Sequence, residues 1–342
     1  MENKSMIENP LVSVHMITYN HAPYISQAIE SVLMQKTNFP FEIVIGEDCS
    51  TDNTREIVVK YKNKYPEIIN LLPSEYNTGL MKNMYRTEKA CRGKYIAYCE
   101  GDDYWHRPDK LQIQTDYLET HPKCGLVHSD YNRLFNKSGK TIHNFVQTEK
   151  SIPPDDLDFY KILHGGKTIY ILLCSVMVRK DLLWKVTDAD PYIYQTATFL
   201  TGDTVRWAEI SLLARTAYID ESLATNRLLE ESVSRTKNLR KQTEFGKNNR
   251  ELFMYLIDKH KLSKDERRKH EIIWCDYALL QAFHNNNRRL GLEARAKLPT
   301  LTFRQKCFFL GSQNSFLNHT TKIIWSIYRW FKKCSLAFIS KE

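Results

Sequence analysis

The chain has 342 residues, of which 42% are hydrophobic and 12% aromatic. That composition provides a sizeable core and excludes disordered, collagen-like and disulfide-stapled small proteins. Residues 1–234 hold 26 Lys and Arg against 31 Asp and Glu, whereas residues 235–342 hold 23 against 9. The net charge of +9 therefore comes entirely from the last third of the chain.

Short apolar, β-branched runs alternate with stretches of helical periodicity through the first hundred residues. The predicted strands are 11–18, 41–45, 68–72 and 95–99, and the predicted helices are 24–35, 55–65 and 82–91. This alternation implies a parallel sheet covered by helices on both faces. Ligands of such sheets bind at the carboxyl ends of the strands.

Polar residues cluster where the predicted strands end. They are Thr18, Tyr19 and Asn20 after the first strand, Glu47 and Asp48 after the second, and the segment EGDDYW, 100–105, after the fourth. Because the carboxyl ends of parallel strands share one edge of the sheet, the three loops are expected to form one site.

The adjacent acids Asp102 and Asp103 follow directly after a predicted strand. Two neighbouring carboxylates repel each other unless a cation or hydrogen-bond donors hold them, and such oxygen ligands suit Mg²⁺ or Mn²⁺. The alternative is a solvated acidic turn in which Asp103 caps a helix that begins near Pro108.

A second acidic pair, Glu47 and Asp48, also lies at a strand end ahead of a helix. Asp48 is placed to accept a hydrogen bond from a nucleobase, and Tyr19 offers an aromatic face on which the base can stack. Alternatively, Asp48 caps its own turn and Tyr19 belongs to the core.

Three ordered segments carry a resemblance to a known family. They are VSVHMITYN from Val12, EIVIGEDCSTDNT from Glu42 and GKYIAYCEGDDYWHRPDKL from Gly93. The pattern, which extends over about residues 10–234, resembles the family 2 glycosyltransferases, inverting enzymes of the nucleotide-sugar-binding GT-A fold. It implies an α/β fold with a Rossmann-like, mostly parallel sheet.

With this resemblance the chain divides into two parts. Residues 1–235 are expected to form the catalytic domain, with a donor half at about 10–125 and an acceptor half at about 126–235. Residues 236–342 are expected to form a basic helical extension.

The resemblance also implies roles for individual residues. Tyr19 would flank the base, Asp48 would accept from its ring N–H, Asp102 would lie near the ribose, and Asp103 would coordinate Mn²⁺ or Mg²⁺ at the diphosphate. The candidate donor-binding residues also include Thr18, Asn20 and Glu47, which lie at the same strand ends. A metal there stabilises the negative charge that grows on the leaving group.

An inverting transfer needs a base that takes a proton from the acceptor hydroxyl. The family usually offers an acid at a helix start about a hundred residues after the metal site, and Asp203 in FLTGDTVRWAEI fits this description. Asp203 is therefore the candidate catalytic base. The alternative, that it only caps its helix, is compatible with that role.

Residues 218–235 look like the family segment that closes over the donor phosphates. Arg227 and Ser234 occupy matching positions and are expected to bind the diphosphate. The family's usual His is replaced by Leu229, and Glu231 replaces a common Gly. These departures weaken the assignment on the phosphate side of the site.

The last third of the chain is rich in Lys, Arg, Glu and Leu with helical periodicity. Residues 321–340 are predicted to form a basic amphipathic helix with aromatic residues on one side. Such a helix either contacts a membrane interface peripherally or packs on the body of the protein.

The sequence therefore predicts an inverting glycosyltransferase that uses a nucleotide-diphospho-sugar, first of all a UDP-sugar, and a glycan or lipid-linked acceptor. The alternatives are an inactive glycosyltransferase-like binding module, a metal-dependent nucleotidyltransferase, and a nucleic-acid-binding protein acting through its basic helices. A binding role for nucleic acid is not expected, because no recognised motif for it occurs.

Three further features bear on the cellular compartment. No run of eighteen apolar residues occurs, and the first ten residues lack the apolar block of a secretory signal. The eight cysteines are scattered without a CxxC pair, so reduced thiols are expected. We predict a cytoplasmic protein, with possible peripheral contact at the inner face of the membrane.

Overall fold

The computed structural model describes residues 7–148, 157–164, 171–196, 199, 202–229 and 238–324. The chain divides into two compact units, residues 1–230 and residues 231–342. The described parts of these units are called the sheet unit and the helical unit below.

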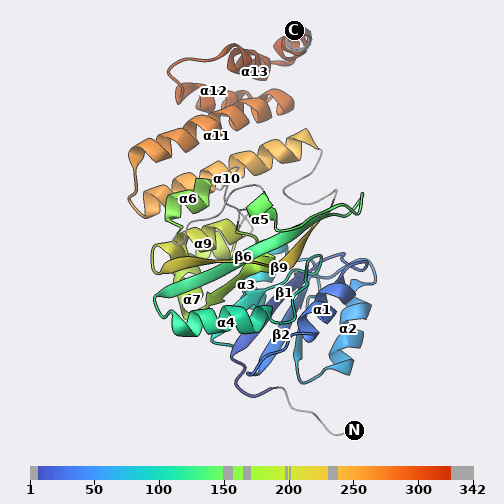
Figure 1. The fold of residues 1–342 in the computed structure, drawn as a ribbon. Helices are drawn as coiled ribbons and strands as arrows, with labels where there is room; N and C mark the ends of the chain where they lie inside the picture. The colour runs from blue at the N-terminus through green and yellow to red at the C-terminus, as the bar shows by residue number, and fades with distance from the viewer. Residues whose placement is uncertain are drawn as a thin grey trace, which may run out of the picture. The chain divides into compact units, whose positions relative to one another are not determined.

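The sheet unit is built on one sheet in which β3, β2, β1, β4, β8, β6, β9 and β5 lie side by side in that order, with β7 paired to β6 (Figure 1). The strands are β1 (Val12–Thr18), β2 (Phe41–Glu47), β3 (Ile69–Pro73), β4 (Tyr95–Tyr98), β5 (Tyr104–Trp105), β6 (Cys124–Phe135), β7 (Thr141–Ile142), β8 (Val176–Arg179) and β9 (Arg215–Leu228). The four predicted strands are β1 to β4, and they run parallel to one another, as expected. Strand β8 is antiparallel to both of its neighbours, β4 and β6.

Helices cover this sheet. They are α1 (Ile25–Leu33), α2 (Thr54–Lys64), α3 (Leu80–Lys89), α4 (Lys110–Thr120), α5 (Phe145–Thr148), α6 (Phe159–His164), α7 (Lys180–Ala189), α8 (Pro191–Tyr194) and α9 (Asp203–Ser211), with a 3₁₀ turn at Leu173–Ser175. Helix α2 begins where Asp52 accepts hydrogen bonds from the backbone N–H and the hydroxyl of Thr54. Its N-cap residue, Asn53, makes no capping hydrogen bond with its own side chain.

The two faces of the sheet differ in chemistry. Because side chains alternate along a strand, Val14 and Met16 of β1 point to one face and His15 to the other. The first face is an apolar core shared with α1, α2 and α4. On the second face, the ring of His15 is tilted against that of Tyr98 in β4, and the Tyr98 ring meets Trp207 of α9 edge-on at 5.4 Å.

The helical unit consists of α10 (Leu239–Lys259), α11 (Lys264–Asn285), α12 (Arg288–Ala296) and α13 (Phe303–Gln313). Their core is a cluster around Trp274, Leu279 and Phe283. Side chains of Asn238 and Ser263 cap α10 and α11, because each accepts hydrogen bonds from the first turn. In the part of the chain that is described, no helix has the length and apolar character needed to span a membrane. Most of the amphipathic segment predicted at 321–340 lies outside the described residues.

Candidate functional site

The ends of β1, β2 and β4 are joined by backbone hydrogen bonds, as a shared sheet edge requires. Thr18 of β1 pairs in register with Glu47 of β2, and the Asp48 N–H donates to the Thr18 carbonyl at 3.1 Å. On the other side, the Gly101 N–H donates to the carbonyl of Ile17 at 3.0 Å. The three predicted loops therefore lie together at one edge.

Asn20 holds the first loop against the second. Its backbone has a left-handed φ of 56°, which asparagine tolerates better than most residues. Its side-chain oxygen accepts from the Thr51 N–H at 2.8 Å, and its own N–H donates to Ser50 Oγ at 3.0 Å. The neighbouring Tyr19 is 42% exposed. Asn20 thus shapes the loop that presents Tyr19, whose ring is accessible to a base.

The two acids of the second pair, Glu47 and Asp48, lie in different environments. Glu47 is fully buried and forms an ion pair with Arg55, and it also accepts from the Ser50 N–H at 2.7 Å. Asp48 accepts from the N–H groups of Thr78 and Gly79 at 2.8 and 2.9 Å. The neighbours of Glu47 give it a structural role, whereas the loop after β3 fixes the direction of the Asp48 carboxylate.

Two buried polar atoms at the first loop have no hydrogen-bond partner within the described residues. They are Thr18 Oγ1 and His21 Nδ1. A Cβ atom at Gly101 would lie 2.6 Å from the first and 2.8 Å from the second. Only a glycine fits there, so the acidic loop packs directly on these two groups. An orphaned hydroxyl and imidazole at a strand end are suited to contact a polar ligand.

Asp103 is held by the strand that lies next to its own. It is 4% exposed and accepts from the Arg227 N–H at 2.7 Å and from the carboxamide of Asn226 at 3.1 Å. Burial raises the pKa of Asp103 to about 7, and the charge of Asp102 adds to this effect. The N-cap of α4 is Asp109, so the alternative that Asp103 caps this helix is wrong.

Glu100 lies within electrostatic range of three other carboxyl groups, Asp102, Asp103 and Asp203, and we call these four the carboxylate cluster. Burial raises the pKa of Glu100 well above its ordinary range, and the charges of Asp102, Asp103 and Asp203 raise it further. Asp203 therefore lies within electrostatic range of the loop after β4, although it is about a hundred residues away in sequence.

The carboxylate cluster has the chemistry of a divalent-cation site. Asp103 Oδ2 accepts from Asn226 at 3.2 Å, and the Cys174 thiol also interacts with this carboxyl group. Each carboxylate oxygen has two lone pairs, so a cation can share it with a hydrogen-bond donor. Within the described ranges there is no group of three acidic, His or Cys side chains placed to enclose an ion. An ion at Asp103 would therefore complete its coordination with other oxygens, as Mg²⁺ does with water and substrate phosphates.

Asp203 is the first residue of α9 and follows the N-cap Gly202. Burial raises its pKa, while hydrogen bonds from Thr204 and the positive charge of Arg206 act in the opposite direction. A carboxylate whose pKa is raised towards neutrality is a better proton acceptor than an exposed one. Asp203 therefore combines a raised pKa with a position at the first residue of α9.

Arg227 is fixed beside the acidic loop rather than free in solvent. Its Nε donates to the Asp102 carbonyl at 2.9 Å, its Nη2 donates to Gln27, and its guanidinium lies 4.7 Å from the Tyr24 ring centroid. It is therefore positioned near the metal candidate Asp103. Ser234, the other predicted diphosphate ligand, lies outside the described residues.

Two residues of the site were not predicted. Asn226 holds Asp103 and is adjacent in sequence to the predicted Arg227, which was the one available signal. Glu100 opens the predicted EGDDYW segment, but only its burial beside three other acids sets it apart. Trp105 is 1% exposed and donates to the Cys174 carbonyl at 3.0 Å, so it packs beneath the loop.

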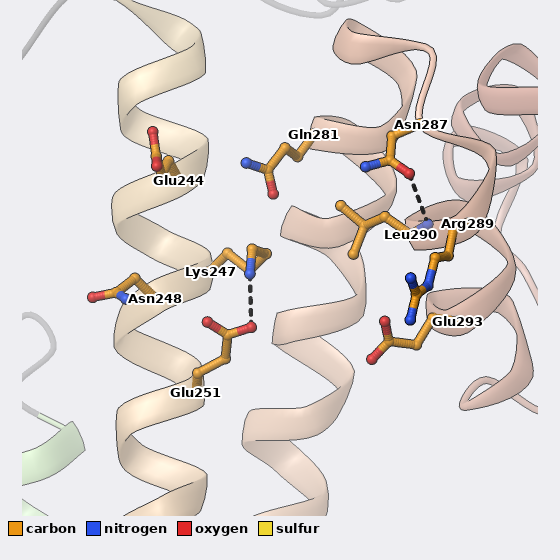
Figure 2. A pocket seen from close by; sticks show the side chains of 9 residues that line it. All are labelled: Glu244, Lys247, Asn248, Glu251, Gln281, Asn287, Arg289, Leu290 and Glu293. Carbon is orange, nitrogen blue, oxygen red and sulfur yellow. Dashed lines mark hydrogen bonds and ion pairs between the residues drawn. The ribbon is translucent and has the colours of Figure 1, made fainter. Parts of the chain in front are cut away.

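The helical unit has a polar surface pocket of about 420 Å³ (Figure 2). Its lining consists of Glu244, Lys247, Asn248, Glu251, Gln281, Asn287, Arg289, Leu290 and Glu293. Lys247 pairs with Glu251 at 2.7 Å, and Asn287 accepts from the Leu290 N–H at 3.1 Å. None of the predicted site residues lines this pocket.

The chain belongs to glycosyltransferase family 2, because the family model described as Glycosyl transferase family 2 matches residues 13–186, just over half of the chain. The matched region contains the ends of β1, β2 and β4, where the site has just been described. This membership confirms the resemblance seen in the sequence and the expected class of enzyme.

The chain is also similar in sequence to two bacterial proteins, one uncharacterized and one a putative glycosyltransferase. The chain is 40% identical over 129 residues to the uncharacterized protein Rv1520 of Mycobacterium tuberculosis, a match that covers 38% of this chain and only 37% of that protein. It is 29% identical over 229 residues to the putative teichuronic acid biosynthesis glycosyltransferase TuaG of Bacillus subtilis, covering 67% of this chain and 83% of TuaG.

Solved structures share the fold. A crystal structure of S. aureus TarS 1-349 in complex with UDP-GlcNAc has a TM-score of 0.54 and 20% identity, covering 88% of this chain and 79% of that one. The mannosyltransferase PcManGT from Pyrobaculum calidifontis, in complex with GDP-Man and Mn²⁺, has a TM-score of 0.50 and 14% identity, covering 90% and 87%. These likenesses confirm the predicted GT-A fold class.

Proposed function

We propose that the chain is an inverting glycosyltransferase that moves a sugar from a nucleoside-diphosphate sugar to a hydroxyl of a glycan or lipid-linked acceptor. The observation that carries the proposal is the site at the strand ends, in which Asn226 and the Arg227 N–H hold Asp103, and Asp203 at the start of α9 lies within electrostatic range of Glu100 in the same acidic loop. A UDP-sugar is the first donor to test, because a neighbour of the same fold was solved with UDP-GlcNAc.

The donor would lie across the ends of β1, β2 and β4. The exposed ring of Tyr19 would stack on the base, and the Asp48 carboxylate, aimed by Thr78 and Gly79, would accept its ring N–H. Arg227 would contribute positive charge on the diphosphate side. The orphaned Thr18 Oγ1 offers one further polar contact to the donor.

Asp103 would hold Mn²⁺ or Mg²⁺ through its second carboxylate oxygen, which also accepts from Asn226. When bound, such an ion neutralises charge on the diphosphate of the donor. The neighbouring solved structure with Mn²⁺ supports a divalent metal as the cofactor of this fold. Asn226 and the Arg227 N–H would keep the Asp103 carboxylate in place whether or not the ion is present.

Asp203 would take the proton of the acceptor hydroxyl. As that O–H bond breaks, the acceptor oxygen forms a bond to the anomeric carbon from the face opposite the leaving group. As this bond forms, the bond between the anomeric carbon and the phosphate oxygen breaks, and the nucleoside diphosphate leaves with the electron pair. The configuration at the anomeric carbon is inverted as a result.

Calorimetric titration of UDP, GDP and CDP, with MnCl₂ and again with EDTA, tests the donor site. We expect UDP to bind only with the metal, and Asp103→Ala to lose this binding. Asp203→Asn should bind UDP as the native chain does and lose transfer by roughly 10²–10⁴-fold. Asp116→Asn, an exposed acid on α4, is the matched control and should change neither.

The outcomes separate the parts of the proposal. If no nucleotide binds under any condition, the inactive binding module becomes the better description. Full transfer by Asp203→Asn, measured with a screened UDP-sugar and acceptor set, would remove Asp203 as the base while leaving the donor site intact. The product's anomeric configuration, determined by NMR, decides between inversion and retention.

A further inference from the structure

A buried ion pair lies directly behind the candidate base. Arg206 of α9 and Glu88 of α3 are 0% and 1% exposed, with Nε 3.1 Å from Oε1 and Nη2 donating to Oε2 at 3.2 Å. The hydroxyl of Tyr98 in β4 donates to the same Glu88 Oε1 at 3.1 Å. The pair therefore links the helix that carries Asp203 to the strand that leads into the carboxylate cluster.

Aromatic rings enclose this pair on the second face of the sheet. The Arg206 guanidinium lies 4.8 Å from the Tyr194 ring centroid, and Trp207 meets the Tyr98 ring edge-on. His15 of β1 lies between Tyr98, 5.0 Å away between ring centroids, and the Met84 carbonyl at 3.2 Å. Strands β1 and β4 and helices α3 and α9 thus meet around one charge pair.

The guanidinium also touches the backbone that precedes Asp203. A Cβ atom at Gly202 would lie 2.3 Å from Arg206 Nη1 and 2.6 Å from Met81 Cε. Arg206 and Gly202 are therefore packed in direct contact, with Met81 of α3 closing the other side. The N-cap of α9 cannot shift towards α3 without moving the guanidinium.

Burial of such a pair is not explained by stability. Desolvating two charges costs several kcal/mol per ion, and well-packed apolar residues are often at least as stable in their place. What a charge pair offers instead is a fixed geometry, because it is satisfied in one arrangement only. In the structure, Arg206 of this pair contacts Gly202, the residue directly before the candidate base Asp203.

We propose that Arg206 and Glu88 are a positioning pair for sugar transfer: their contact fixes the start of α9 and so directs the Asp203 carboxylate at the acceptor hydroxyl. The inference rests on the proposed role of Asp203 as the base. Neither residue touches substrate in this account, so both act through Asp203.

The test uses the full chain with Arg206→Lys, Arg206→Met and Glu88→Gln. We expect kcat to fall about 10–100-fold, as misplacement by about 1 Å costs in other enzymes, with acceptor KM and UDP affinity changed by no more than about threefold. Glu42→Gln, which alters the buried acid of the separate ion pair between Glu42 of β2 and Arg92, is the matched control and should keep kcat within about threefold.

The decisive measurement repeats Arg206→Lys and Glu88→Gln in the Asp203→Asn background. If the pair acts through Asp203, these changes alter the residual transfer rate by less than about twofold. A further loss of about tenfold in that background would show a general structural effect and overturn the inference.

Three outcomes are distinguished. An inactive Asp203→Asn together with native kcat in folded Arg206→Lys and Arg206→Met overturns the positioning role alone. A fully active Asp203→Asn instead overturns the proposed base. If Arg206→Met does not fold, as judged by its UDP binding and melting, Tyr98→Phe removes one hydrogen bond from Glu88. In that case the positioning role requires that Tyr98→Phe lower kcat without weakening UDP binding.

Discussion

In the sheet unit, charged side chains are buried throughout, whereas in the described part of the helical unit no Asp, Glu, Lys or Arg is buried. The buried charged residues of the sheet unit are Glu42, Glu47, Asp48, Glu88, Asp103, Lys110, Asp130, Asp190, Arg206 and Glu209. The helical unit instead buries Thr243, His270, Gln305, Ser312, Asn318 and Thr321 as its polar residues. Its charges lie on the surface, and its core is aromatic and aliphatic.

This difference shows which unit is built for chemistry. A buried charge lowers stability unless it is paired, so it persists where it does something that an apolar residue cannot. In the sheet unit, the buried carboxylates of Glu47, Asp48 and Asp103 accept hydrogen bonds that fix the loops at the strand ends. The buried pair of Arg206 and Glu88 joins α9 to α3. The core of the helical unit is apolar, and its charges lie at the surface, where several of them form ion pairs.

The largest effect is expected when a buried charge is removed from the site in the sheet unit. Asp103→Asn should lower transfer by roughly 10²–10³-fold, because charge stabilisation at the diphosphate is lost. The same change should raise the free energy of unfolding by about 1–3 kcal/mol at pH 7 in EDTA, since the pKa of Asp103 is raised to about 7 from 3.8.

The sign follows from proton binding. Between pH 4 and 7 the native Asp103 keeps a proton that the unfolded chain has released, so native stability decreases as pH rises through this range. Differential scanning calorimetry of both proteins from pH 4 to 8 measures the effect. A gain for Asp103→Asn that does not grow with pH would contradict the burial argument, and Asp116→Asn serves as the exposed control.

The helical unit should respond to the opposite change. Leu279 is fully buried in its apolar cluster, so Leu279→Ala should lower the free energy of unfolding of this unit by about 2–5 kcal/mol. Because no predicted donor ligand lies in this unit, UDP affinity should stay within about twofold. Leu292→Ala, at a position 46% exposed, is the matched control. If folded Leu279→Ala lost UDP binding, the helical unit would also be needed for the donor site, and the contrast between the two units would be wrong.

A buried histidine gives the sheet unit its own acid sensitivity. Burial lowers the pKa of His128 to about 3 from 6.5. As pH falls below 6.5 the unfolded chain gains a proton that native His128 does not, so stability is lost at up to about 1.4 kcal/mol per pH unit down to pH 3. Urea unfolding from pH 4 to 7 should show a shallower slope for His128→Leu, and an unchanged slope for the exposed His319→Gln.

The positions of the site that follow strand ends could be predicted from the sequence. Parallel strands share an edge, so the apolar runs predicted to end at Thr18, Ile45 and Cys99 were enough to group the polar residues behind them. The start of α9 was found through the family pattern around Asp203. The parallel direction of the first four strands follows from the same alternation of strands and helices, whereas their order in the sheet was not predicted.

The contacts that hold the site could not be predicted in the same way. Asn226 reaches Asp103 through the register of β9 with β5 and β6, and register shifts near Ser129 and Asp130 alter that alignment. The partner of Arg206 lies 118 positions earlier in the chain. An arginine inside an amphipathic helix ordinarily faces solvent, so only the folded chain reveals its burial.

The smallest expected effects separate two residues of the pocket in the helical unit. Lys247 and Glu251 form a partly exposed pair four residues apart, and such pairs contribute about 0.3–0.5 kcal/mol. Lys247→Ala should therefore change the free energy of unfolding by less than about 0.5 kcal/mol.

Glu251 also accepts from the indole N–H of the buried Trp274 at 2.9 Å, so Glu251→Ala leaves that donor unpaired and should lower the free energy of unfolding by about 1–3 kcal/mol. Equal losses in the two variants, measured by urea unfolding at low salt, would mean that the helical unit depends on its surface charge pair after all.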